Sequence, residues 1–160
     1  MDERSLRAEA SPSPRSHLRD CLGAAEYGRL VGVWRSAVKA THHFLAEADR
    51  LDIESRLIDA YFPQVRLTVM DVGGEVIAFS GTAGESLEML FVAADARGRG
   101  AGSELLAHAV REQGVRRVDV NEQNEQAVRF YARRGFVVMG RSDHDEAGRP
   151  YPLLHMTLEE

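Results

Sequence analysis

A glycine-rich turn between an apolar segment and an amphipathic one is the feature that most constrains the fold of this chain. Residues 87–92 are mostly apolar and predict a buried strand, while residues 103–113 place apolar side chains on one stripe at helical spacing. A strand, a glycine turn and a helix aim unpaired backbone N–H groups and the positive helix end at an anion, and glycine permits close approach. The turn reads Arg97-Gly98-Arg99-Gly100-Ala101-Gly102, which predicts a pyrophosphate-binding site.

Two common phosphate-binding patterns do not fit this turn. A dinucleotide fingerprint needs a third glycine, and Ser103 stands in that position. The phosphate loop of NTPases needs a lysine after its last glycine, whereas the one lysine of the chain is Lys39. Neither pattern accounts for the turn.

A second polar motif follows in the chain. Residues 118–120 predict a short strand, residues 121–124 a polar turn, and residues 125–134 a helix that ends before Gly135. Asn124 is a favourable N-cap residue, and the spacing of Asn124, Ala127 and Tyr131 puts all three on one helix face. This face is a second candidate for ligand binding. The alternative is that the aromatic residues of the helix serve only to pack it into the core.

Together, Arg-x-x-Gly-x-Gly and Asn-x-x-Ala-x-x-Phe-Tyr-x-x-x-Gly-Phe resemble the two coenzyme A elements of the GNAT N-acetyltransferases. The resemblance covers nearly the whole chain after an N-terminal tail and is closest to small bacterial YjaB-like acetyltransferases. Further matching segments are residues 34–45, 121–128, 140–142 and 150–154. The resemblance implies the α/β (α+β) class and the GNAT fold, in which helices flank a central mixed, mostly antiparallel sheet. It also implies acetyl-CoA as cosubstrate.

The resemblance implies a set of cosubstrate-binding residues in these two motifs and in the strand before the first. They are Phe91, Val92, Arg97, Gly98, Arg99, Gly100, Ala101, Gly102, Ser103, Asn121, Asn124, Ala127 and Tyr131. In the family, a backbone N–H at the end of that strand, here near Phe91 and Val92, polarises the thioester carbonyl. A backbone donor aimed at the charge that develops on the oxygen stabilises the transition state by about 3 kcal/mol.

The remaining periodicities predict one domain over residues 17–160, preceded by a disordered tail over residues 1–16 that contains Ser-Pro-Ser-Pro. The predicted order is β–α–α–β–β–β–α–β–α–β–β, which is the GNAT order. The predicted strands are 18–21, 65–72, 75–80, 86–93, 118–120, 136–139 and 153–158, and the additional helices are 24–40 and 47–61, with Pro63 ending the latter. Residues 82–84 are predicted to form a turn.

Composition limits the classes of function. A chain of 160 residues with 44% hydrophobic and 28% charged residues is typical of one globular domain. A net charge of −5 disfavours nonspecific nucleic-acid binding and favours a cationic acceptor. No apolar run predicts a membrane span or a secretory signal, and a lone Cys21 excludes an internal disulfide. We therefore expect a cytoplasmic monomer or homodimer that binds neither membrane nor nucleic acid.

The chemistry of acetyl transfer then assigns roles to two residues. Tyr131 is the candidate general acid, because phenol and thiol pKa values of about 10 and about 8.5 permit proton transfer to the leaving thiolate. Glu88 interrupts an apolar strand, where a carboxylate is costly unless it is used or paired, and burial would raise its pKa towards that of a base. Alternatively, Glu88 lies at the wet end of the strand and faces solvent.

The sequence predicts an N-acetyltransferase in which a small-molecule or peptide amine attacks acetyl-CoA directly in a ternary complex. The candidate acceptor-binding residues are Trp34, His42, His43, Phe44 and Tyr151. No metal is expected, since adjacent histidines do not share a helix face. The acidic loop at residues 142–146 either attracts the amine or is a solvated turn. The alternative functions are a non-catalytic acyl-CoA sensor and a nucleotide-binding regulator.

Overall fold

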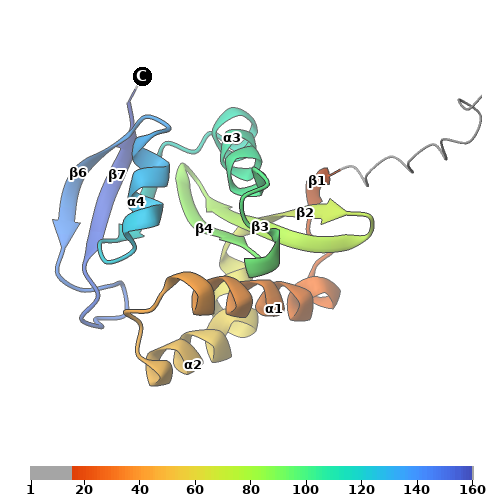
Figure 1. The fold of residues 1–160 in the computed structure, drawn as a ribbon, viewed down its shortest axis with the longest axis horizontal. Helices are drawn as coiled ribbons and strands as arrows, with labels where there is room; N and C mark the ends of the chain where they lie inside the picture. Colours follow the sequence, from red (N-terminus) through yellow and green to blue (C-terminus); the bar gives the residue numbers. More distant parts are fainter. Residues whose placement is uncertain (1–15, 160) are drawn as a thin grey trace, which may run out of the picture.

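The computed structural model describes residues 16–159, and one mixed sheet runs through this part of the chain (Figure 1). The strand order in the sheet is β1-β2-β3-β4-β5-β7-β6. The strands are β1 (Ser16–Asp20), β2 (Arg66–Val72), β3 (Glu75–Ala83), β4 (Ser86–Val92), β5 (Arg117–Asn121), β6 (Phe136–Ser142) and β7 (Leu153–Leu158). The helices are α1 (Ala24–Thr41), α2 (Glu47–Arg56), α3 (Ala101–Gln113) and α4 (Glu125–Ala132). Short π- and 3₁₀-helical turns are η2 (Leu57–Tyr61), η3 (Phe62–Gln64) and η4 (Ala94–Ala96).

The predicted element order is confirmed, and the differences lie at element ends. The second helix was expected to continue to residue 61, but α2 ends at Arg56 and the chain passes through η2 before η3, which contains Pro63. The turn expected at residues 82–84 is shorter, because Thr82 and Ala83 still pair with β4. The strand expected at residues 136–139 continues to Ser142, since β7 pairs with it that far.

The N-terminal tail lies outside the described residues over positions 1–15, and Ser16 already belongs to β1. β1 is an edge strand that pairs with β2. Arg19 on β1 binds Glu26 at the start of α1, with Nη2 2.8 Å from Oε2, and Asp71 on β2 at 3.2 Å. These ion pairs tie the edge strand to its neighbours. No helix in residues 16–159 is long and apolar enough to cross a membrane.

The helices cover the two faces of the sheet, α1 on one side and α3 and α4 on the other (Figure 1). Successive residues of a strand point to opposite faces, and β3 shows this directly. Phe79 packs in the core cluster of α1, which contains Trp34, whereas Ala78 packs against Leu105 of α3. A third cluster joins α3 and α4 to β5 through Leu106, Val118 and Tyr131.

The sheet opens between β4 and β5, the one parallel neighbour pair in the described sheet. Their ladder contains Ser86 opposite Arg117 and Leu87 opposite Val118, and no further pair among the described residues. β4 continues to Val92 and β5 to Asn121, so the two strands diverge beyond this point. The divergence leaves backbone groups and side chains of both strands accessible at the centre of the sheet.

A β-bulge lies where the two strands separate. Gly81 of β3 pairs with Met89, while the next residue, Thr82, pairs with Leu87, so Glu88 is an extra residue in β4. Bulges redirect side chains and are frequent beside active sites. Gly81 is required at this point, because a Cβ there would lie 2.9 Å from Cγ2 of Val65. The bulge turns Glu88 out of the regular alternation of the strand.

Candidate active site

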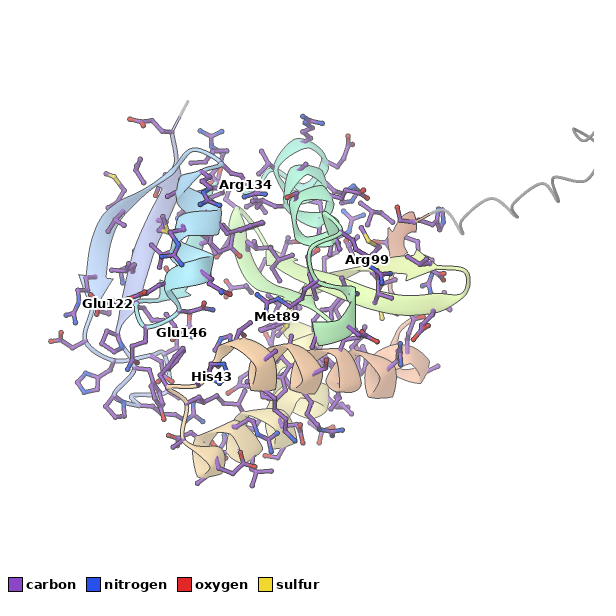
Figure 2. The ribbon with its side chains drawn as sticks, viewed as in Figure 1. His43, Met89, Arg99, Glu122, Arg134 and Glu146 are labelled. Carbon is purple, nitrogen blue, oxygen red and sulfur yellow. The ribbon has the colours of Figure 1, made fainter. Side chains whose placement is uncertain are left out.

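The glycine turn leads into α3 with the geometry of an anion site. Gly100 is the residue before α3 and has φ +83°, and Gly98 has φ +80°, a region that favours glycine. The carbonyl of Gly100 accepts from the N–H of Glu104 at 3.0 Å, which begins the helical hydrogen bonding. The N–H groups of the first turn, before Glu104, therefore have no acceptor within the helix and point out of its N-terminal end. Figure 2 shows Arg99, which belongs to this turn.

Helix α4 stands next to the glycine turn. Arg97 donates from Nη2 to Oε1 of Gln126 at 2.8 Å, which connects the turn to α4. A Cβ at Gly102 would lie 3.6 Å from the ring of Phe130, so the start of α3 approaches the second half of α4 closely. Asn124 caps α4 as predicted, because its Oδ1 accepts from the N–H of Ala127 at 3.2 Å.

Tyr131 is buried at the inner side of α4, with 7% of its surface exposed. Its ring contacts Phe130 and Phe136 edge-on, with centroid distances of 5.1 and 5.7 Å. Burial raises the pKa of the Tyr131 phenol well above its usual value, so the hydroxyl keeps its proton. The hydroxyl has no hydrogen-bond partner within residues 16–159, and it is available to a ligand.

Four cavities surround the gap between β4 and β5. The α3–α4 cavity, of about 240 Å³, lies between the end of α1, β4, α3 and α4, and its lining includes His42, Phe91, Arg97, Gly102, Asn124 and Tyr131. The gap cavity, of about 150 Å³, lies between the diverging strands, and its lining includes His42, Glu88, Phe91, Asp119, Asn124 and Tyr131.

Two larger cavities lie on the other side of the gap. The α2 cavity, of about 490 Å³, is lined by residues that include Trp34, Tyr61, Glu88, Met89, Phe91 and Glu146. The loop cavity, of about 480 Å³, is lined by residues that include Glu88, Asp119, Asp145, Glu146 and Arg149. Figure 2 shows Met89 on β4 and Glu146 on the β6–β7 loop, which contribute to these walls. Because Glu88 lines three of the four cavities, they adjoin at the β-bulge.

The chain matches known proteins in sequence and in fold. The family described as Acetyltransferase (GNAT) domain matches residues 40–159. The chain belongs to the GNAT acetyltransferase family. The peptidyl-lysine N-acetyltransferase YjaB of Salmonella typhimurium is 41% identical over 129 residues, which are 80% of this chain and 88% of that protein. YjaB of Escherichia coli is 40% identical over 128 residues, 79% of this chain and 86% of that protein.

Solved structures agree with the family. The solution structure of apo YjaB from Escherichia coli has a TM-score of 0.79 at 36% identity and covers 89% of this chain and 97% of that one. PaiA N-acetyltransferase from Thermoplasma acidophilum, in complex with coenzyme A, has a TM-score of 0.67 at 18% identity over 89% of this chain and 99% of that one, a likeness of fold. The predicted family, the predicted fold and the assignment as an acetyltransferase are confirmed.

In this GNAT chain the predicted motifs come together at the gap. Asn124, Ala127 and Tyr131 line the same two cavities, so their predicted common face is confirmed. Phe91 and Val92 also line the α3–α4 cavity, and Asn121 lines the gap cavity. The remaining residues of the first motif form the turn and the start of α3.

Glu88 is exposed, as in the alternative that its side chain faces solvent, and its role as a base stays a prediction. It is exposed and lines cavities at the same time, because the bulge turns its side chain out of the strand. Burial, followed by repulsion from Glu88, Asp119 and Asp145, raises the pKa of the Glu146 carboxyl group, which lines the same loop cavity. The loop cavity is therefore lined by four carboxyl groups, those of Glu88, Asp119, Asp145 and Glu146.

The acidic loop forms a hydrogen-bonded turn and also lines a cavity, and its attraction for the amine stays a prediction. Asp145 and Glu146 line the loop cavity, while Oδ1 of Asp145 also accepts from the N–H groups of Ala147 at 3.0 Å and Arg149 at 2.7 Å and so shapes the turn. Asp119 was not predicted. The signal that identifies it is its acidic side chain on the strand face opposite to the buried Val118 and Val120.

The five candidate acceptor residues divide into two groups. Trp34, 4% exposed, lines the α2 cavity, and His42 lines the α3–α4 and gap cavities. His43, Phe44 and Tyr151 line none of the four cavities described above. His43 is exposed near the end of α1 (Figure 2).

Tyr151 instead joins the β6–β7 region to α2. Its hydroxyl accepts from the N–H of Ala46 at 3.1 Å and donates to Asp49, and its ring lies 6.0 Å from that of Phe44. Arg149 adds ion pairs to Asp52 and Asp145. These contacts hold the wall of the loop cavity in place. Within residues 16–159 no group of three or more His, Cys, Asp or Glu side chains is arranged to bind a metal ion.

Proposed function

We propose that this GNAT enzyme transfers an acetyl group from acetyl-CoA to the side-chain amine of a lysine in a peptide or protein, by direct attack in a ternary complex. One observation supports the proposal above all. The gap between β4 and β5 joins a cavity beside the anion-binding turn to cavities walled by carboxylates. This is the arrangement that an anionic acyl donor and a cationic amine need in order to meet.

In this proposal the glycine turn and α4 bind acetyl-CoA, the acetyl donor. The N–H groups at the start of α3, with Arg97 and Arg99, suit the pyrophosphate of coenzyme A. Asn124 and Ala127 line the cavity that leads from the turn to the gap, where the pantetheine arm would lie. When bound, acetyl-CoA supplies the thioester. Near Phe91 and Val92, β4 pairs with β3 and has no β5 partner, so the backbone N–H that points away from β3 is accessible to the thioester oxygen.

Tyr131 is proposed as the proton donor to the departing sulfur. Its phenol remains protonated because burial raises its pKa, and its hydroxyl has no competing partner in the described chain. Burial makes the phenol a weaker acid, so its main contribution is a hydrogen bond to sulfur that strengthens as negative charge develops there.

Glu88 is proposed as the base for the amine. A lysine ammonium has to lose one proton before attack, since its pKa is about 10.4. Glu88 lies at the junction of the cavities, where a carboxylate can take that proton directly or through water. The net reaction releases one proton, because the amine loses two and the thiolate takes one.

The acceptor class follows from charge and from the relatives. Glu88, Asp119, Asp145 and Glu146 repel one another around the loop cavity, and a bound ammonium group would relieve this repulsion. The relatives YjaB are named peptidyl-lysine N-acetyltransferases. We propose that Trp34 forms the apolar wall of the acceptor site and that Phe44 and Tyr151 support it, with His43 at the rim.

The test is an assay of coenzyme A release with a lysine tripeptide blocked at both ends, compared with spermidine and free amino acids. The expected result is peptide-dependent release together with a mass increase of one acetyl group on lysine. Binding of acetyl-CoA without release for any amine would instead favour the acyl-CoA sensor. Competition by ATP or NAD would favour the nucleotide-binding regulator.

A further inference from the structure

His42 lies between the α3–α4 cavity, proposed for acetyl-CoA, and the gap cavity between β4 and β5. It follows the last residue of α1, and its backbone N–H donates to the carbonyl of Val38 at 2.8 Å. Its ring lies 6.5 Å from that of Phe91 and 5.3 Å from that of Phe44, between centroids. His42 lines both the α3–α4 cavity and the gap cavity, as Tyr131 does.

The hydrogen bonds of Thr41 determine which ring nitrogen of His42 bears hydrogen. Oγ1 of Thr41 lies 2.8 Å from the carbonyl oxygen of Ala37, which can only accept, so the single hydroxyl hydrogen of Thr41 is donated there. Nδ1 of His42 lies 2.7 Å from the same Oγ1. Nδ1–H is therefore the donor in this contact, and Nε2 of the neutral ring has a lone pair and no hydrogen.

The ring is neutral at physiological pH. Burial, with a smaller contribution from His43, lowers the pKa of His42 to about 4. The charged or titratable groups around the two cavities come from other elements: Arg97 before α3, Glu88 on β4, Asp119 on β5 and Tyr131 on α4. Nε2 has no partner in residues 16–159. His42 is half-buried and lines two cavities, so a ligand in them can supply a donor to Nε2.

We infer that Nε2 of His42 accepts a hydrogen bond from the N–H of the attacking amine and so aims the nitrogen lone pair at the thioester carbon. Thr41 is the positioning residue that keeps Nδ1 protonated and Nε2 free. The inference rests on the proposed function, because it concerns the amine in that reaction. As the C–N bond forms and the C–S bond breaks, the amine proton leaves to the base and not to His42, whose role is orientation.

The test uses two substitutions at His42 with opposite expectations. Glutamine can place its carbonyl oxygen near the position of Nε2, whereas phenylalanine keeps a ring without an acceptor. With the blocked lysine tripeptide, we expect His42→Phe to lower kcat/KM for the peptide by at least about 10-fold and His42→Gln to retain most of it. The dissociation constant of acetyl-CoA and the melting temperature should stay unchanged in both variants.

Two substitutions of Thr41, one without and one with a hydroxyl group, test its role as the positioning residue. Thr41→Val removes the hydroxyl that orients the ring at nearly constant volume, and kcat/KM for the peptide should fall by roughly 3- to 10-fold. Thr41→Ser keeps the hydroxyl and should restore the wild-type value, which a loss of packing alone would not explain.

Several outcomes would overturn the inference. Equal loss in His42→Gln and His42→Phe would identify a proton-accepting or packing role instead, and a weakened acetyl-CoA affinity in His42→Phe would place the hydrogen bond on the cosubstrate. If the wild type acetylates the peptide and His42→Phe does so equally well, His42 does not orient the amine, and the proposed function is unaffected. Failure of the wild type to acetylate the peptide would contradict both.

Discussion

His155 and Asp119 face each other across the β5–β7 ladder, and Nδ1–H of His155 donates to Oδ1 of Asp119 at 2.6 Å. On its other side, Nε2 of His155 lies 2.6 Å from Oγ of Ser142 on β6. A Cβ at Gly140 would lie 3.6 Å from Cδ2 of His155, so the imidazole packs over the β6 backbone at this position. One oxygen of Asp119 is therefore held in place at the wall of the gap and loop cavities.

Replacing Asp119 by Asn should weaken acceptor binding, because the amide keeps a hydrogen-bonding oxygen and loses the charge that attracts an ammonium group. We expect KM for the lysine tripeptide to rise about 5- to 10-fold, which corresponds to roughly 1 kcal/mol, with KM for acetyl-CoA unchanged. Asp59→Asn is the control, since it removes the same charge from an exposed site on η2. Equal effects of the two variants would reduce the role of Asp119 to general surface charge.

Replacing Gly100 by Val should disrupt the turn before α3. The φ of +83° costs a non-glycine residue about 1–2 kcal/mol, and the backbone would relax away from the anion site. Calorimetry should show acetyl-CoA affinity at least about 10-fold weaker. Gly28→Ala, in α1 with no atom within 4 Å of its added Cβ, should leave affinity unchanged and slightly raise the melting temperature. Unaltered affinity in Gly100→Val would exclude the turn from the binding site.

The Tyr131→Phe substitution removes only a hydroxyl that has no partner in the described chain. Turnover should fall by roughly 10²-fold, while the acetyl-CoA dissociation constant and the melting temperature stay within experimental error. Because burial raises the pKa of this phenol, the wild-type rate should show no loss from Tyr131 ionisation up to about pH 9. The control is Tyr27→Phe in α1, because the ring of Tyr27 packs on Phe62 of η3 and Tyr27 lines none of the four cavities. Full activity of Tyr131→Phe would mean that water protonates the thiolate.

The Glu88→Gln variant should bind acetyl-CoA normally and turn over slowly at neutral pH. Its rate should recover as pH rises towards about 10, because the free amine then accumulates without a base. The measurement is a pH–rate profile of both forms with the lysine tripeptide, with Glu112→Gln on the exposed side of α3 as control. Superimposable profiles for wild type and Glu88→Gln would show that Glu88 is a solvated residue of the β-bulge and does not act as the base.

Acid should weaken the attachment of β1 to α1, because protonation of Glu26 removes its ion pair with Arg19. The hydrogen bond from Arg19 lowers the pKa of Glu26 to about 2, against a reference value of 4.5. A carboxyl group with a depressed pKa stabilises the fold fully above pH 4.5, and this contribution is lost as pH falls towards 2. Glu26→Gln should therefore cost roughly 2–3 kcal/mol at pH 7 and almost nothing at pH 2. A pH-independent difference between the melting temperatures of the two proteins would contradict this account.

The sequence alone determined the parts of the site that depend on neighbours along the chain. The glycines before α3, the Asn124 cap and the common face of Ala127 and Tyr131 follow from local spacing, and each was predicted. The element order was also predicted, because apolar periodicity within a segment indicates its secondary structure.

Tertiary structure decided where the charges of the acceptor side gather. The sequence left open whether Glu88 is buried or faces solvent, because its exposure depends on the register of β3 against β4, which inserts one extra residue. Asp119 and Glu146 come from β5 and from the β6–β7 loop, and they meet Glu88 because β4 and β5 diverge after two pairs. Strand register and divergence arise from pairing between distant segments, so no local pattern specifies them.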